Sequence, residues 1–91
     1  MNVVNNLAAS RFETTVDGHL CVCQYRLFGK VLMLVHTGVP SALRGRGIAA
    51  ALVRAALDHA RAKGLKVRPD CSYAATYIER HPETQDLLIA E

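Results

Sequence analysis

The pattern of apolar and polar positions first predicts a series of strands. Residues 11–16 are rich in threonine and apolar side chains, and Asp17-Gly18 after them is a strong hairpin signal. Residues 19–28 are apolar or β-prone at almost every position, which predicts a second strand in a sheet covered on both faces. Residues 31–39 are a near-continuous apolar run, which predicts a third strand in the middle of the sheet.

A helical period replaces the strand pattern in residues 46–63. Apolar side chains recur there at spacings of three and four and form one stripe, which predicts a long amphipathic helix. Arg54 and Asp58 lie away from the stripe, one turn apart, where they can pair. Gly64 is expected to end the helix, because glycine is common just past a helix C-terminus.

The remaining segments complete the predicted fold. Residues 65–68 predict a short strand closed by Pro69, residues 73–81 a short helix, and residues 84–91 a further helical turn, whereas residues 1–10 are expected to fray. A strand, helix, strand crossover usually sets its two strands parallel. The sequence therefore predicts an α/β (α+β) fold: a mixed, mainly antiparallel sheet of about four strands, with a long crossover helix and a short C-terminal helix.

Composition narrows the class of protein. At 91 residues the chain has room for a single domain, 1–91, and its 51% hydrophobic against 21% charged residues favour a compact fold. No apolar run approaches the roughly 18 residues of a membrane span, and the N-terminus lacks the pattern of a signal peptide. Three cysteines, an odd number, favour free thiols. We expect a cytoplasmic protein without membrane contact, a monomer or weak dimer.

The stretch from His36 to Ala51 contains the strongest candidate site. A strand leads into a turn with Gly38 and Pro40, and Arg44-Gly45-Arg46-Gly47 then delivers the chain into the long helix. Glycines there let the backbone approach a ligand, and the unpaired amides of a first helical turn favour a phosphate. The pattern predicts an anion-binding loop, and the net charge of +3 suits an anionic cofactor.

The loop resembles a known family motif. Arg44-Gly45-Arg46-Gly47-Ile48-Ala49 is similar to the Arg/Gln-x-x-Gly-x-Gly/Ala pattern of the GNAT superfamily of N-acetyltransferases, in which this loop binds the acetyl-CoA pyrophosphate through backbone amides. The similarity is greatest to very short, single-domain GNAT-like proteins and runs from about Arg11 to Leu87. Four further segments carry it: His36–Pro40, Gly64–Val67, Cys71–Tyr73 and His81–Thr84.

The resemblance implies a truncated GNAT fold, acetyl-CoA or CoA as cofactor, and acetyl transfer to an amine that the sequence does not identify. It implies that residues 36–39 run along the pantetheine arm. It also places Tyr77 near the CoA sulfur as general acid, with a half-buried structural tyrosine as the alternative. The cofactor-binding residues that it implies are Val39, Arg44, Gly45, Arg46, Gly47, Ile48 and Ala49.

Cys71 and two histidines are the remaining candidates for catalysis. Cys71 ends the last strand, where it could lie near the thioester and accept the acetyl group transiently; a buried structural cysteine is the alternative. His36 and His81 are candidate bases because histidine titrates near neutral pH, although each also suits a structural role. Cys21 and Cys23 share a strand face, but no second paired ligand motif supports a metal site.

Two departures from the family pattern keep a second hypothesis open. Gly38 stands where the family has Glu, and in larger GNAT enzymes a carboxylate on this strand often serves as base; Thr84 stands where the family has Tyr. The chain could therefore be a CoA-binding or regulatory module without efficient turnover. A nucleic-acid-binding role for residues 44–47 is disfavoured, because base-stacking aromatics are few and no basic stripe continues along the helix.

Overall fold

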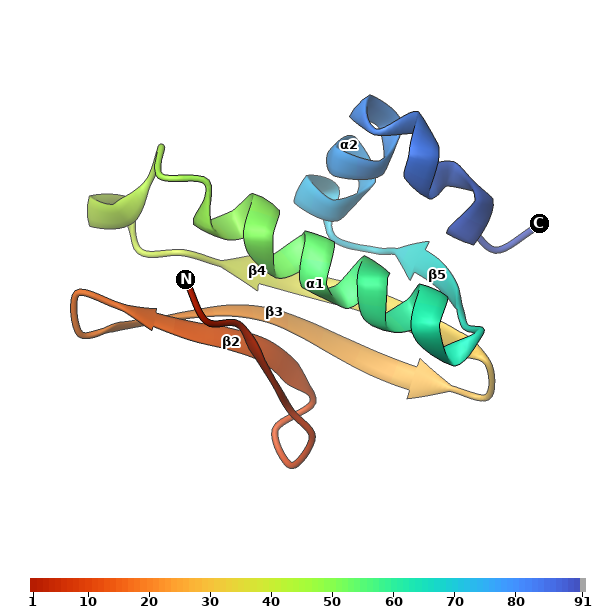
Figure 1. Cartoon of the computed structure of the whole chain (residues 1–91), viewed down its shortest axis with the longest axis horizontal. Helices are drawn as coiled ribbons and strands as arrows, with labels where there is room; N and C mark the ends of the chain where they lie inside the picture. The colour runs from red at the N-terminus through yellow and green to blue at the C-terminus, as the bar shows by residue number, and fades with distance from the viewer. Residues whose placement is uncertain (91) are drawn as a thin grey trace.

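The computed structural model describes residues 1–90, which form one five-stranded sheet and two α-helices (Figure 1). The strands are ordered as in the sequence; the first four pair antiparallel, and the fifth pairs parallel to the fourth. The predicted mixed, mainly antiparallel sheet with a crossover helix is confirmed. Its strands are β1 (Val4–Asn6), β2 (Arg11–Val16), β3 (His19–Phe28), β4 (Val31–Gly38) and β5 (Lys66–Pro69).

The N-terminal segment corrects the prediction that residues 1–10 fray. Residues 4–6 form β1 and pair with β2, so the sheet has five strands rather than about four. Polar side chains hold this strand: the Asn6 amide donates to the Glu13 carboxylate at 2.7 Å, and the Tyr25 hydroxyl donates to the Asn5 side-chain oxygen at 2.7 Å. Asn5 and Asn6 are thus hydrogen-bond partners of neighbouring strands.

The long helix α1 (Ile48–Lys63) crosses the sheet and connects β4 to β5 (Figure 1). It begins at residue 48 rather than 46, because Gly47 takes a left-handed conformation as its N-cap. Gly64 ends it, as predicted, with φ of 68°. The buried stripe that packs on the sheet also matches the prediction and contains Ile48, Leu52, Val53, Ala56, Leu57 and Ala60.

The C-terminal part contains α2 (Ser72–Arg80) and the 3-10 helix η2 (Pro82–Leu87), and a second 3-10 helix, η1 (Ser41–Leu43), precedes α1. The predicted second helix is confirmed one residue earlier than expected. The predicted helical turn over residues 84–91 is partly met by η2, and its last residue lies outside the described residues. Within residues 1–90, no helix is long and apolar enough to span a membrane.

The prediction that both faces of residues 19–28 are covered was wrong. Alternate side chains of β3 are buried, namely Cys21, Cys23 and Tyr25, whereas Leu20 and Phe28 are 44% and 78% exposed. This period of two means that one face of β3 packs on the core and the other faces solvent. Apolar residues on both faces of a strand therefore did not imply helices on both faces.

The sheet is irregular at the C-terminal end of β4. This strand has a bulge opposite β3, and its pairing with β5 ends early. Tyr25 faces Leu34 but the preceding residue, Gln24, faces His36, so Val35 is an extra residue in β4. β5 pairs with β4 only as far as Leu34. The Cys71 amide then donates to the Leu34 carbonyl at 2.8 Å, and the chain turns into α2. Among residues 1–90, no strand pairs with residues 35–38 on the side away from β3.

Candidate functional site

The loop before α1 has the backbone conformation of an anion-binding turn. Gly45 and Gly47 have φ of 82° and 76°, a region that favours glycine. A Cβ atom at either position would meet no other heavy atom within 4 Å, so open space lies beside both. No side chain caps the start of α1, and no acidic residue lies in its first turn. The first-turn amides and the positive end of the helix dipole are thus left for an external anion.

This loop borders a cavity of about 400 Å³ that extends to the end of β4. Its lining contains every predicted cofactor residue except Arg46, together with Thr37, Leu43 and Tyr73. Arg46 instead forms an ion pair of 2.7 Å with Asp17 in the β2–β3 hairpin. The charge of Arg46 is therefore paired with the Asp17 carboxylate. Arg44 lines the cavity and has no ion-pair partner within residues 1–90.

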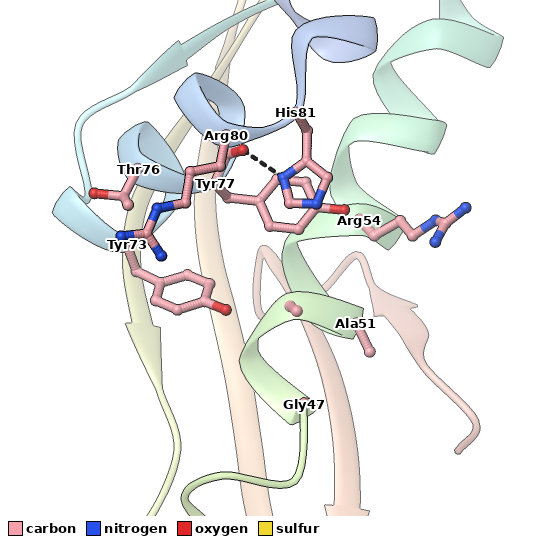
Figure 2. Close-up of a pocket in the computed structure, with 9 residues that line it drawn as sticks. Gly47, Ala51, Arg54, Tyr73, Thr76, Tyr77, Arg80 and His81 are labelled. Atoms are coloured by element: carbon pink, nitrogen blue, oxygen red, sulfur yellow. Dashed lines mark hydrogen bonds between the residues drawn. The ribbon is translucent and has the colours of Figure 1, made fainter.

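A second cavity of about 440 Å³ lies between α1 and α2 (Figure 2). It shares Gly47 and Tyr73 with the first cavity, so the two adjoin. The sequence had singled out Gly47, Tyr77 and His81 from its lining. The others, all missed as site residues, are Ala50, Ala51, Arg54, Tyr73, Thr76 and Arg80. Their spacing of three and four along each helix is a signal that could have found them.

Cys71 lies beside the first cavity, as the N-cap residue of α2. Its thiol donates to the hydroxyl oxygen of Thr37, which lines that cavity, at 3.3 Å. Burial disfavours the thiolate, but the hydrogen bond with Thr37 and the amides of Tyr73 and Ala74 outweigh it, so the pKa of Cys71 is lowered. Burial raises the pKa of Cys23 to about 11. Cys71 therefore forms a thiolate more readily than Cys23 and is the better nucleophile of the two.

Tyr77 lies in the second cavity rather than the first. Its ring stacks on His81 with centroids 3.8 Å apart, and the His81 Nδ1–H donates to the Tyr77 carbonyl at 2.7 Å (Figure 2). Burial raises the pKa of the Tyr77 hydroxyl, which keeps it protonated at neutral pH. Tyr73, three residues before the second-cavity residue Thr76, is the tyrosine that lines both cavities.

His36 is exposed and does not line either cavity. A Cβ atom built on Gly38 would lie 3.0 Å from the His36 Nε2 atom. The imidazole therefore occupies the space beside the position where the family pattern has a carboxylate-bearing side chain. Within residues 1–90, no group of three or more His, Cys, Asp or Glu side chains is arranged to hold a metal ion.

Comparison with known proteins identifies the family. The model of the GCN5-related N-acetyl-transferase family matches residues 11–87. The chain belongs to this family. The match spans the same residues as the similarity that the sequence motifs predicted.

Relatives and solved structures agree with this membership. Protein NATD1 of Gallus gallus and that of Mus musculus are each 43% identical to the chain over 67 residues, which cover 72% of this chain and 61% of NATD1. The match thus spans less than two thirds of these relatives. The NMR structure of a GCN5-like protein of Staphylococcus aureus matches the chain with 27% sequence identity and a TM-score of 0.77. That match covers 99% of this chain and 89% of the other. The GNAT fold is therefore shown.

Proposed function

We propose that this GCN5-related N-acetyl-transferase binds acetyl-CoA in the first cavity and transfers the acetyl group to an amine. The observation that carries the proposal is the start of α1, where Gly45 and Gly47 leave open space over uncapped amides. An incoming pyrophosphate would meet backbone N–H donors and the helix dipole there, with Arg44 adding a positive charge at the rim.

The open edge of β4 suits the pantetheine arm. Residues 35–38 face no strand on the α2 side within residues 1–90, so no strand competes with a ligand for this edge. The Thr37 backbone amide is the exception, because it interacts with the Cys71 thiol. The arm of CoA contains two amide groups, which can pair with such an edge much as an added strand does. Thr37 and Val39 line the cavity along this edge and Gly47 lines its far end, so one extended ligand can reach both.

The transfer step needs a base for the amine and a proton for the departing thiolate. The amine nitrogen attacks the thioester carbonyl, its proton goes to a base, the carbon–sulfur bond breaks, and the sulfur takes a proton. We propose His36 as the base, because its Nε2 atom lies beside the Cβ position of Gly38. Cys71, with its lowered pKa, offers an alternative two-step route: its thiolate attacks the thioester carbonyl and releases CoA, and the amine then attacks the acetyl-Cys71 thioester and releases the Cys71 thiolate. Tyr77 stays a predicted proton donor, and Tyr73 is the alternative that borders both cavities.

A CoA-binding module without efficient turnover is the second candidate. Gly38 favours it, because the strand that carries the site lacks the carboxylate of the family pattern. The cavity beside the glycine loop is equally consistent with this function, since holding the cofactor and deprotonating an amine depend on different residues.

Two measurements separate these candidates. Calorimetric titration with acetyl-CoA is expected to give saturable binding, and absence of binding at millimolar cofactor would refute both. Mass spectrometry of reactions with a panel of amines and lysine peptides is expected to detect acetyl products. Binding without any product would favour the module.

Paired variants then test the proposed base. His36→Asn is expected to lower the rate of transfer by about 100-fold, the size of a typical general-base contribution, while the affinity for acetyl-CoA is unchanged. His19→Asn, an exposed histidine at the start of β3, is the matched control. Tyr73→Phe and Tyr77→Phe make a second pair, in which only the proton donor should lose rate. Equal rates for wild type and His36→Asn would exclude His36 as the base.

A further inference from the structure

The turn between β3 and β4 exposes two large apolar side chains. Phe28 and Val31 form the last pair of this hairpin, and only Gly29 and Lys30 connect them. Leu27 and Phe28 are 58% and 78% exposed, and no other large apolar side chain in residues 1–90 is more exposed than Phe28. Because successive side chains of a strand point to opposite faces, both faces of the turn are apolar. Neither residue has a part in the proposed acetyl transfer.

Three basic side chains surround the turn. Lys30 lies in the turn itself, and Arg26 precedes Phe28 by two residues, which places both on one face of β3. Lys63 is the last residue of α1, and this end of the helix lies beside the turn (Figure 1). The Lys66 amide donates to the Lys30 carbonyl there at 2.9 Å. We call residues 26–30 together with Lys63 the basic tip, and all of its residues are exposed.

No carboxylate neutralises the charges of the basic tip. The sequence has no Asp or Glu between Asp17 and Asp58. Within residues 1–90, Arg26, Lys30 and Lys63 form no ion pair. The ion pairs there also do not include the predicted pair of Arg54 and Asp58, and their basic members are Arg11, Arg46, Arg61 and Arg68. Three unpaired positive charges therefore surround two exposed apolar side chains.

The shape of the basic tip favours a soft surface as its partner. A hairpin with a two-residue turn projects from the sheet, and none of its residues 26–30 lines either cavity described above. A projection with apolar side chains on both faces can enter a layer that deforms around it, while long basic side chains reach outward to anionic groups. The interface of an anionic bilayer provides such a layer and such groups.

We propose that the basic tip docks the protein on the surface of anionic phospholipid bilayers. Leu27 and Phe28 enter the interface, and Arg26, Lys30 and Lys63 contact the headgroups. Peripheral binding of this kind needs no spanning helix, so the inference revises the expectation of a protein without membrane contact, which considered only spanning and signal segments. The glycine loop lies at the other end of α1, whose 16 residues span about 24 Å, and therefore stays accessible.

The first test is sedimentation of the full chain with phospholipid vesicles. Half of the protein is expected to sediment at about millimolar phosphatidylserine in vesicles of equal phosphatidylserine and phosphatidylcholine. Vesicles of phosphatidylcholine alone should bind far less, and added salt should weaken the binding. The double variant Lys30→Gln, Lys63→Gln should bind about 25-fold more weakly, since each basic residue contributes about fivefold. The matched control, Lys30→Arg with Lys63→Arg, keeps both charges and should bind as wild type does.

The second test measures insertion of the apolar side chains. The chain has no tryptophan, so Phe28→Trp introduces a single indole fluorophore at the basic tip. With the anionic vesicles its emission should shift to shorter wavelength and be quenched by lipids brominated in their acyl chains. Leu20→Trp is the matched control, because Leu20 is also exposed but lies near the other end of β3. Its emission should not change. Thermal unfolding confirms that each variant is folded.

Several outcomes would overturn the inference. Absence of sedimentation at tenfold higher lipid would do so, as would equal binding to neutral and anionic vesicles or unchanged binding of the Gln double variant. Sedimentation without quenching of Phe28→Trp would show that another surface docks. A shift of Phe28→Trp emission with protein concentration alone would make the basic tip an interface between two copies of the chain. None of these results bears on acetyl-CoA binding, so the proposed function is tested separately.

Discussion

Replacing Gly47 by alanine tests whether the start of α1 is the pyrophosphate site. Gly47 has φ of 76°, and a Cβ atom there would meet nothing within 4 Å, so the cost of Gly47→Ala to the free protein is conformational rather than steric. Left-handed backbone costs alanine about 1–2 kcal/mol, and the reduced freedom of the unfolded chain returns about 0.4–1 kcal/mol. The net loss of about 1 kcal/mol should lower Tm by about 4–8 °C in a domain of this size.

Gly64 provides a matched control at the other end of the same helix. It has φ of 68° and also has nothing within 4 Å of a Cβ position, so Gly64→Ala should lose the same stability. Only Gly47→Ala places a methyl group in the open space beside the first-turn amides. We expect Gly47→Ala to weaken acetyl-CoA binding more than tenfold by calorimetry at a temperature where both variants are folded. Equal affinities of the two variants would refute the assignment of the loop.

Three further predictions concern other parts of the chain. Cys71 should be alkylated by iodoacetamide faster than an ordinary thiol at pH 7, and Thr37→Val should slow the reaction because it removes a hydrogen bond that lowers the pKa of Cys71; a mass-spectrometric time course unchanged by the variant would contradict this. The bond to Arg61 lowers the pKa of Asp86, so its stabilisation is present at neutral pH and lost as pH falls through that lowered value. The urea midpoints of wild type and Asp86→Asn should therefore differ at pH 7 and converge at low pH. Leu52 is fully buried, and Leu52→Ala should cost about 2–5 kcal/mol of unfolding free energy in urea titrations.

The sequence predicted the elements whose signals are local. The helical period from Ile48 to Ala60 and the glycine at position 64 identified α1 and its end, and the motif at residues 44–49 identified the loop. Asp17-Gly18 correctly marked the hairpin between β2 and β3. Each of these features depends on neighbours within a few residues, which is why spacing and turn chemistry revealed it.

Features that depend on tertiary pairing were missed. The bulge at Val35 lies in a continuous apolar run, where no alternation exists to show a change of register. Arg46 pairs with Asp17, which is 29 positions away in the sequence, and the family motif that implied a cofactor contact for Arg46 gave no sign of this partner. β1 depends on Asn5 and Asn6 finding partners on other strands. No local pattern predicts such contacts.

The departure of β5 from β4 has a consequence for the order in which the chain folds. β1 to β4 form from contacts between neighbouring hairpins, whereas the parallel β4–β5 pair and the bond between the Cys71 amide and Leu34 close a loop across the whole of α1. Loop closure of that length makes such contacts slower to form. We therefore expect the two walls of the second cavity to come together after the meander has formed. A ligand that contacts both α1 and α2 would stabilise their association. It should therefore slow amide hydrogen exchange in the C-terminal segment more than in β2 and β3.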